Sequence, residues 1–428
     1  MKRREFVKTA GAAAGALVAG GKTGRAQGSS PIEHVVVVMM ENRSFDHILG
    51  WLPNANGMQA GLSYQDSSGI MRQTFELAPD YTGCSYLDPD HSYQGARTEY
   101  DGGEMDGFLK VQPGSLYPIG YYQEKDLPFR SALARNYVTC DHYFSSILAP
   151  TFPNRIFQHC GQTDRLDDSL TICTLPTIWD RLAAAGISHK YYFNNIPFVA
   201  LWGMKYLNIA APYAHFLADC AAGTLPAVSF VDPSFTLLFN LAEDDHPHSD
   251  VRNGDAFMAK TFHAVSSSPN WPSTALIFNY DEWGGFFDHI VPPRAIAPNN
   301  VDTDLVDGKA LLGIRVPCIV ASPWTQGNPA SPSVNSTVFD HTSVLKLIES
   351  VFGVPPLAAR ESSADVGDLL EVFDFDRPSS TVPALPSPGF VIPSTICQSD
   401  LAPSRPDSEA GIFQRMTESG MLRGWPGY

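Results

Sequence analysis

Short apolar runs that end abruptly in polar residues recur along this chain. They are rich in β-branched and aliphatic residues, which is typical of strands buried on both faces of a parallel sheet. The runs cover residues 34–40, 227–231, 275–280 and 316–321. Helical patterns lie between them, for example at residues 177–185 and 343–352. This alternation predicts an α/β domain with a mostly parallel central sheet flanked by helices on both faces.

Two stretches depart from this alternation. Residues 53–130 are rich in Gly, Tyr and Asp and show little periodicity, so we interpret them as an insertion or cap that contributes loops to the site. From residue 376 to residue 428 the chain is first rich in Pro and Ser, which indicates a surface-wrapping tail, and then shows a short helical pattern at 409–422. We therefore assign the catalytic domain to residues 27–375.

The N-terminus has the pattern of an export signal. Arg3 and Arg4 precede a weakly apolar Ala/Gly-rich run at residues 10–21, and small residues around Gly24 and Ala26 offer a cleavage site. A twin arginine before such a run resembles the Tat signal, so residues 1–26 are predicted to direct export to the periplasm or beyond the cell. An untargeted N-terminal segment is the alternative. The run is shorter than the about 20 residues that span a bilayer, and no other stretch predicts a transmembrane helix.

Charge and cysteine content narrow the choice of partners. The 428 residues carry a formal net charge of −16, which argues against a nucleic-acid partner held through its phosphates. The charge also implies that any phosphate chemistry needs a local cation. Seven cysteines without a CxxC pair would permit three disulfides in an oxidising compartment, with Cys160 and Cys173 closing the shortest loop. Oligomeric state is not predicted by any of these features.

Acidic and amide side chains follow two of the predicted strands directly. Glu41 and Asn42 come after the first run, and Asp281 and Glu282 come after the third. Ligands of α/β sheets bind beyond the carboxyl ends of the strands, where these side chains would fall. Consecutive acids at the end of a buried strand are costly unless a cation or a donor compensates them. A metal site is therefore predicted, although a capped turn or an ordinary loop would also account for these residues.

Two further segments offer groups for proton transfer and attack. His246 lies in the acidic segment 244–250, next to Asp245, and could exchange protons, bind a metal or contact a phosphoryl oxygen. Thr151 stands between two prolines that would fix its hydroxyl, with Arg155 four residues later as a brace for an anion or a carboxylate. A solvated acidic loop is the alternative for residues 244–250, and a threonine without a catalytic role is the alternative for Thr151.

Taken in order, these segments resemble the phosphoesterase family that contains bacterial and plant non-specific phospholipases C and related acid phosphatases. The resemblance spans about residues 31–355. It rests on the series ENRSFDHILG (41–50), PTFPNR (150–155), DDHPHSD (244–250), DEWGGFFDHIVPP (281–293) and FDHTSVLKLIE (339–349). The family resembles the alkaline phosphatase superfamily, so the resemblance implies an alkaline phosphatase-like fold with the site above the strand ends.

The resemblance also implies roles for individual residues. The implied ligands of a divalent metal are Glu41, Asn42, Thr151, Asp281 and Glu282, and Ca, Zn, Mn and Mg all remain open. Thr151 matches the family's nucleophile. The implied catalytic histidines are His246, His91 and His189. The supporting residues are Arg155, Asp245, Asp288 and His289.

These assignments predict an exported, metal-dependent phospholipase C. It would cleave a phospholipid such as phosphatidylcholine to diacylglycerol and a phosphorylated head group, through a phosphothreonine intermediate. Transient contact with a lipid surface would follow. An acid phosphatase that uses the same residues on phosphomonoesters is one alternative, and a non-catalytic exported binding protein is an alternative of another class.

Overall fold

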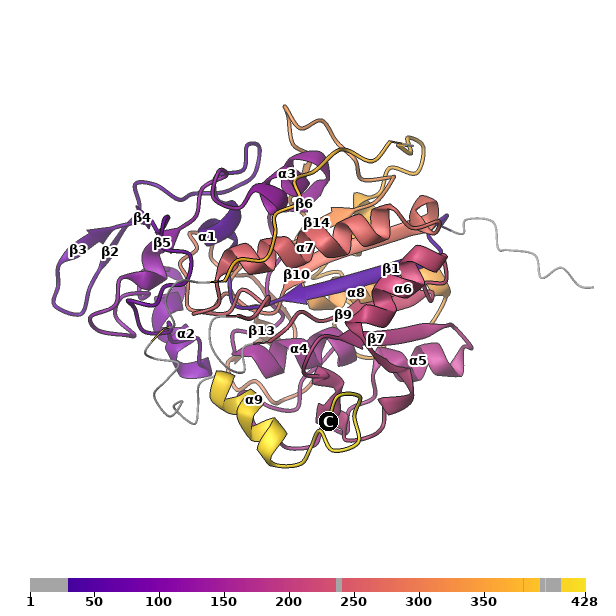
Figure 1. Cartoon of the computed structure of the whole chain (residues 1–428). Coiled ribbons are helices and arrows are strands. Elements are labelled where there is room, and N and C mark those ends of the chain that lie inside the picture. Colours follow the sequence, from indigo (N-terminus) through magenta and orange to yellow (C-terminus); the bar gives the residue numbers. More distant parts are fainter. Residues whose placement is uncertain (1–29, 236–240, 380, 393–396, 398–408) are drawn as a thin grey trace, which may run out of the picture. The chain divides into compact units, whose positions relative to one another are not determined.

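The computed structural model describes residues 30–235, 241–379, 381–392, 397 and 409–428. The predicted signal peptide at residues 1–26 lies outside these described residues. The predicted α/β architecture is confirmed, because the strands build a central sheet in the order β15-β6-β14-β10-β1-β9-β7-β8 with helices packed on it (Figure 1). The bounds are β1 His34–Met40, β6 Val138–Cys140, β7 His189–Phe193, β8 Ala210–Pro212, β9 Val228–Val231, β10 Thr274–Tyr280, β14 Ile319–Ala321 and β15 Val334–Asn335.

The central sheet is mostly parallel. β1 lies between β10 and β9 and runs parallel to both, and β7 runs parallel to β9 and β8. The four apolar runs named above correspond to β1, β9, β10 and β14. β14 begins only at Ile319 and pairs antiparallel with β10 and β6. Pro317, which lacks a backbone N–H, precedes the start of this strand.

Helices cover both faces of the sheet. In one group α3 and α6 pack against α7, and in the other α5 and α8 pack against α4 (Figure 1). The bounds are α3 Pro128–Asn136, α4 Thr151–Cys160, α5 Ile178–Ala184, α6 Tyr213–Ala222, α7 Val251–Ser266 and α8 His341–Phe352. The helices predicted at 177–185 and 343–352 are α5 and α8. Thr177 caps the start of α5, and its side chain accepts the N–H of Asp180 in a capping box.

The remaining elements lie outside the central sheet. Residues 53–130 contain short strands β2 Ser63–Gln65, β3 Met71–Gln73, β4 Phe75–Glu76 and β5 Gly120–Tyr121, together with α2 Tyr93–Tyr100. A second small sheet has the order β11-β13-β12, with bounds Arg294–Ile296, Lys309–Leu311 and Leu305–Val306. α1 Phe45–Leu49 follows β1, and α9 Glu409–Glu418 lies near the C-terminus. No helix within the described residues is long and apolar enough to cross a membrane.

The prediction of a disulfide between Cys160 and Cys173 was wrong. Cys84 pairs with Cys397, 313 residues away, whereas Cys160 and Cys173 are both free and buried. Burial beside Cys173 raises the pKa of the Cys160 thiol well above its usual value. A short separation along the chain is therefore a poor guide here, because the fold brings Cys84 and Cys397 to a Cα–Cα distance of 4.9 Å.

A pair of buried carboxyl groups joins α8 to the segment after it. Glu349 of α8 and Glu361 hydrogen bond to each other, and Glu361 Oε2 also accepts the N–H of Leu357 at 2.9 Å. Burial, followed by the charge of Glu361, raises the pKa of Glu349 to about 8, and burial raises the pKa of Glu361 to about 7. The pair therefore keeps protons in the folded state at a pH where the unfolded chain has released them.

Replacing Glu349 with glutamine should make the protein more resistant to alkaline pH. Because both carboxyls have raised pKa values when folded, the wild type loses stability as pH rises from about 4.5 to about 8. Glu349→Gln removes one of these groups and keeps its shape. We expect its Tm, relative to wild type, to increase by about 2 °C or more between pH 5 and pH 9. Exposed Glu104→Gln is the control, and an equal Tm difference at both pH values would contradict the prediction.

Candidate active site

Three neighbouring strands of the sheet end in acidic residues. Glu41 follows β1, Asp281 follows β10 and Asp232 follows β9. The register pairs Met40 with Tyr280, so Glu41 and Asp281 are the next residues on adjacent parallel strands. All three carboxylates are buried. The carboxyl-end placement expected for Glu41 and Asp281 thus follows from the parallel pairing of β1 with β10.

The turn after β10 folds against the turn after β1. The N–H of Asn42 donates to Asp281 Oδ1 at 3.0 Å, and Asn42 itself has a left-handed backbone with φ 58°. Gly284 lies so close that a Cβ there would be 2.2 Å from the carbonyl oxygen of Asn42. Glycine at this position therefore permits the approach of the two turns. The N–H of Gly284 in turn donates to Glu282 Oε2 at 2.7 Å, which brings Glu282 to the same place.

Thr151 is the first residue of α4, and its hydroxyl points at Asn42. Thr151 Oγ1 donates to Asn42 Oδ1 at 3.3 Å, and the side chain is buried. Asn154, in the first turn of α4, fixes the preceding segment because its amide donates to the carbonyl oxygens of Ile147 at 3.1 Å and Ala149 at 2.7 Å. A helix start with a fixed approach therefore holds the hydroxyl over the strand ends.

Arg155 bridges the three strand-end acids. It lies one turn beyond Thr151 on the same face of α4. Its guanidinium contacts Glu41 Oε1 at 2.8 Å, Asp232 Oδ1 at 3.3 Å and Asp281 Oδ2 at 3.1 Å. A planar guanidinium can serve several carboxylates at once. From the sequence, Arg155 was expected to brace an anion or a carboxylate, and the structure places it against three carboxylates.

At the edge of the central sheet where β1, β9 and β10 end, the buried acids carry more negative charge than Arg155 neutralises. Burial, followed by the charge of Asp281, raises the pKa of Glu282 well above its usual value. Burial also raises the pKa of Asp232 to about 7, against the opposing effect of Arg155. Within the described part of the chain, the buried Glu282 Oε1 has no hydrogen-bond partner. An orphaned carboxylate oxygen among buried acids is the environment in which a bound cation is favourable.

The ligand types here fit a divalent cation. Glu41, Asn42, Thr151, Asp281 and Glu282 all offer oxygen atoms, which hard cations such as Ca²⁺, Mg²⁺ and Mn²⁺ prefer. Neighbouring histidines would also admit Zn²⁺.

A second cluster, formed by Asp46, Asp288 and His289, has its ligand atoms within 4.8 Å of one another. Arg315 already neutralises it, with Nε at 2.9 Å from Asp288 Oδ1 and an Nη at 3.2 Å from Asp46 Oδ1. The N–H of His289 donates to the other oxygen of Asp46 at 2.9 Å. Because protein donors occupy these oxygens, the cluster fastens α1 to the segment after β10.

Two of the three predicted histidines reach the edge. His91 Nε2 lies 3.4 Å from Asn42 Nδ2, and the rings of His91 and His246 are 5.9 Å apart. His246 Nε2 lies 3.9 Å from Asp88 Oδ2. The cap-like region thus contributes His91, and the segment after β9 contributes His246.

His189, the third predicted catalytic histidine, does not lie at this edge. It begins β7 and pairs with Val228 at the start of β9, whereas the predicted site lies beyond the other ends of these parallel strands. Its Nδ1 lies 2.7 Å from the carbonyl oxygen of Ile187, and its ring stacks on Trp179. The structure therefore removes His189 from the catalytic set, because a strand start and a strand end lie at opposite edges of a parallel sheet.

Asp245 stabilises the segment that carries His246 through hydrogen bonds to neighbouring elements. Its carboxylate accepts two hydrogen bonds from Arg130, at 2.7 and 3.2 Å, and one from the Tyr280 hydroxyl at 2.6 Å. Its carbonyl oxygen accepts Arg43 Nε at 2.8 Å. These bonds tie the segment that carries His246 to β10 and to the turn after β1.

The last motif of the series is also structural. Asp340 caps α8 in a capping box, and its carboxylate pairs with Arg360 at 3.2 Å. His341 Nε2 lies 2.9 Å from the carbonyl oxygen of Tyr280, the residue that ends β10. α8 therefore holds the strand end from which Asp281 projects.

Two acids that the sequence did not single out lie at the edge. The sequence contains one indication of the place of Asp232, since it follows a buried apolar run as Glu41 and Asp281 do. For Asp168 it contains none, because this residue lies in an irregular segment after α4. Its Oδ1 accepts the N–H of Phe152 at 2.7 Å, and its charge contributes to the raised pKa of Glu282. Burial raises the pKa of Asp168 itself to about 6.

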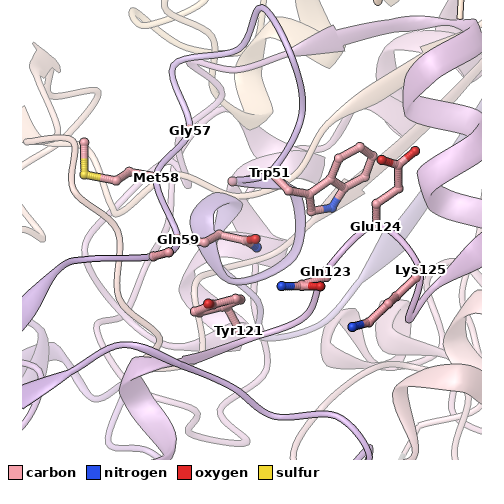
Figure 2. Close-up of a pocket in the computed structure, with 10 residues that line it drawn as sticks. Trp51, Gly57, Met58, Gln59, Tyr121, Gln123, Glu124 and Lys125 are labelled. Carbon is pink, nitrogen blue, oxygen red and sulfur yellow. The ribbon is translucent and has the colours of Figure 1, made fainter.

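A surface pocket elsewhere shares no lining residue with this edge. It has a volume of about 550 Å³ and lies where the end of α1 meets the segment after β5 (Figure 2). Trp51, Met58, Tyr121, Glu124 and Lys125 are among its lining residues. The predicted chemistry therefore does not coincide with this cavity.

The fold and the edge together define an α/β enzyme whose acidic strand ends surround a helix-borne hydroxyl. The chain belongs to the phosphoesterase family, whose model matches residues 32–355, and it is therefore a hydrolase that acts on phosphoric ester bonds. The resemblance stated from the sequence is confirmed.

Relatives with assigned names agree with this membership. Phospholipase C A of Mycobacterium tuberculosis is 33% identical over 473 residues, covering 91% of this chain and 88% of that protein. Non-specific phospholipase C6 of Arabidopsis thaliana is 33% identical over 365 residues, covering 77% of this chain and 70% of that protein. A Vibrio parahaemolyticus protein of the alkaline phosphatase superfamily has a TM-score of 0.38 at 12% identity, covering 81% of this chain and 71% of that one. That structural similarity is too low to support an inference.

Proposed function

We propose that the protein is an exported, metal-dependent phospholipase C. The observation that carries the proposal is the Thr151 hydroxyl, held 3.3 Å from Asn42 Oδ1 above buried strand-end acids. A hydroxyl at a helix start, beside oxygen ligands and two histidines, is an arrangement suited to attack on phosphorus. The names of the relatives, which are phospholipases C, support the choice of a phospholipid diester as substrate.

The metal would be held by Glu41, Asn42, Thr151, Asp281 and Glu282. A divalent cation bound there would neutralise phosphoryl charge and lower the pKa of the attacking hydroxyl. Arg155 would keep Glu41 and Asp281 in place, since it contacts both carboxylates. Metal identity stays open among Ca, Zn, Mn and Mg, because oxygen ligands and histidines lie at the same edge.

The residues of the chain then supply a two-step substitution. Thr151 Oγ1, after releasing its proton to solvent, forms a bond to phosphorus while the bond from phosphorus to the glycerol oxygen breaks. His246 or His91 donates a proton to the departing glycerol oxygen, which leaves as diacylglycerol. Water then attacks the phosphothreonine and returns a proton to the histidine, the bond from phosphorus to Oγ1 breaks, and the phosphorylated head group is released.

Export and contact with lipid belong to the same proposal. The twin arginine and the Ala/Gly-rich run support transport by a Tat-like signal to the periplasm or the cell exterior. The Cys84–Cys397 disulfide is the kind of bond that persists in oxidising compartments. Access to a phospholipid would require transient contact with a lipid surface.

The test compares substrates and metal dependence with purified mature protein. Phosphatidylcholine vesicles and p-nitrophenyl phosphate are each incubated with enzyme, with EDTA, and with EDTA followed by each candidate metal. We expect release of diacylglycerol and phosphocholine, loss of that release in EDTA, and recovery with one of the metals. Hydrolysis of the monoester alone would make the protein a phosphatase, and no hydrolysis of either substrate would favour a binding protein.

A further inference from the structure

Asp168 contacts the helix that carries Thr151. Asp168 Oδ1 accepts the N–H of Phe152 at 2.7 Å, and Phe152 is the second residue of α4. The residue at the usual capping position is Pro150, which makes no side-chain capping bond. Asp168 therefore provides, from 16 residues further along the chain, an acceptor that normally stands directly before a helix.

This contact places a negative charge beside the attacking hydroxyl. The N–H of Phe152 belongs to the peptide that joins it to Thr151, so covalent geometry keeps Asp168 Oδ1 within about 8 Å of Thr151 Oγ1. Asp168 forms no ion pair with any lysine or arginine within the described ranges. By contrast, Arg155 pairs with Glu41 and Asp281 at the same edge. The charge of Asp168 is thus one that an incoming substrate meets.

The charge discriminates between two kinds of phosphate ester. A phosphodiester carries one negative charge at neutral pH, whereas a phosphomonoester, with a second pKa of about 6, carries nearly two. An additional charge about 8 Å from a carboxylate is repelled enough to change binding severalfold in a partly solvated site. The carboxylate therefore disfavours the monoester more than the diester.

We propose that Asp168 is a specificity-determining residue that caps α4 and selects phosphodiesters over phosphomonoesters. This inference rests on the proposed function, since it concerns the substrate class of the same site. The Asp168 side chain has two roles in this proposal, capping of α4 and selection of the substrate. The capping bond needs an acceptor oxygen, and the selection needs the charge. Asparagine keeps the first and removes the second.

The test measures kcat/KM at pH 7.5 for bis(p-nitrophenyl) phosphate and p-nitrophenyl phosphate, which share a leaving group. Asp168→Asn is expected to raise the monoester-to-diester ratio about tenfold over wild type. Asp168→Ser, a second neutral capping residue, should shift the ratio in the same direction. Asp168→Ala should lower kcat for both substrates and lower Tm, because the cap is lost as well. Asp167→Asn is the matched control, since it removes an exposed charge one residue away.

The outcomes separate this inference from the proposed function. An unchanged ratio in both Asp168→Asn and Asp168→Ser, or an equal change in Asp167→Asn, overturns the role of Asp168 while diester hydrolysis by the wild type leaves the proposed function standing. Absence of diester hydrolysis in the wild type itself would instead overturn the proposed function. A higher ratio with unchanged Tm in Asp168→Asn supports selection by charge.

Discussion

Thr151→Ala is expected to lower kcat for phosphatidylcholine by at least about 10⁴-fold, because it removes the proposed nucleophile without disturbing the helix. Alanine fits the first position of α4, and within the described residues the Thr151 side chain makes one hydrogen bond, to Asn42. The fold should therefore survive the change. Diacylglycerol release from vesicles measures the loss, and circular dichroism confirms that the variant is folded.

Thr151→Ser is the matched control, since it keeps a hydroxyl at the same place. We expect it to retain activity within about tenfold of wild type. An acid quench during turnover, followed by mass spectrometry of the peptide that contains residue 151, should find phosphate on wild type and on the serine variant. Substantial activity in Thr151→Ala, or phosphate on another residue, would contradict the proposed mechanism.

Arg155→Met is expected to cost about 3–5 kcal/mol in the free energy of unfolding at pH 8, because it leaves buried carboxylates without their cation. Glu41, Asp232 and Asp281 would face one another at the strand ends with only a bound metal to offset them. Methionine retains much of the volume, so the loss reports on charge more than on packing. Urea denaturation in EDTA at pH 8 measures it.

The loss should be smaller at pH 5. Asp232 has a pKa of about 7 even beside Arg155, and a variant without the guanidinium would hold its protons more tightly still. Protonation at low pH therefore removes part of the repulsion. Arg252→Met, which breaks a half-exposed pair with Asp250, is the control and should cost less than about 1 kcal/mol. An equal cost for Arg155→Met at both pH values would argue against repulsion as the cause.

The fold and part of the site followed from local pattern. Continuous apolar runs predicted β1, β9 and β10, and the polar residues after them predicted that Glu41 and Asp281 meet at one edge. The parallel pairing of these strands makes that inference reliable, since ends of adjacent parallel strands lie together. The grouping of Asn42, Glu282 and Thr151 with them was implied by the family resemblance.

Other features could not be predicted, because they depend on contacts between distant segments. Asp168 reaches Phe152 from an irregular loop that has no pattern of its own. Cys84 and Cys397 meet only after the chain between them has folded, so a prediction from loop length chose the wrong pair. His189 was included through the family resemblance, but it begins β7 and so lies at the other edge of the sheet from the strand ends.

The acids of the site project from strand ends, whereas His91, Asp88 and Asp168 come from loops. Strand positions are fixed by ladder pairing, and a slip of one residue would turn every side chain of β1 to the other face. The loops carry no such constraint. In the proposed enzyme, the metal-binding acids after the strands and the substrate-selecting Asp168 therefore lie on parts of the chain under different structural constraints. Substrate selectivity in such a scaffold can therefore change by exchange of the segment after α4 that carries Asp168, while the acids after β1, β9 and β10 stay in place.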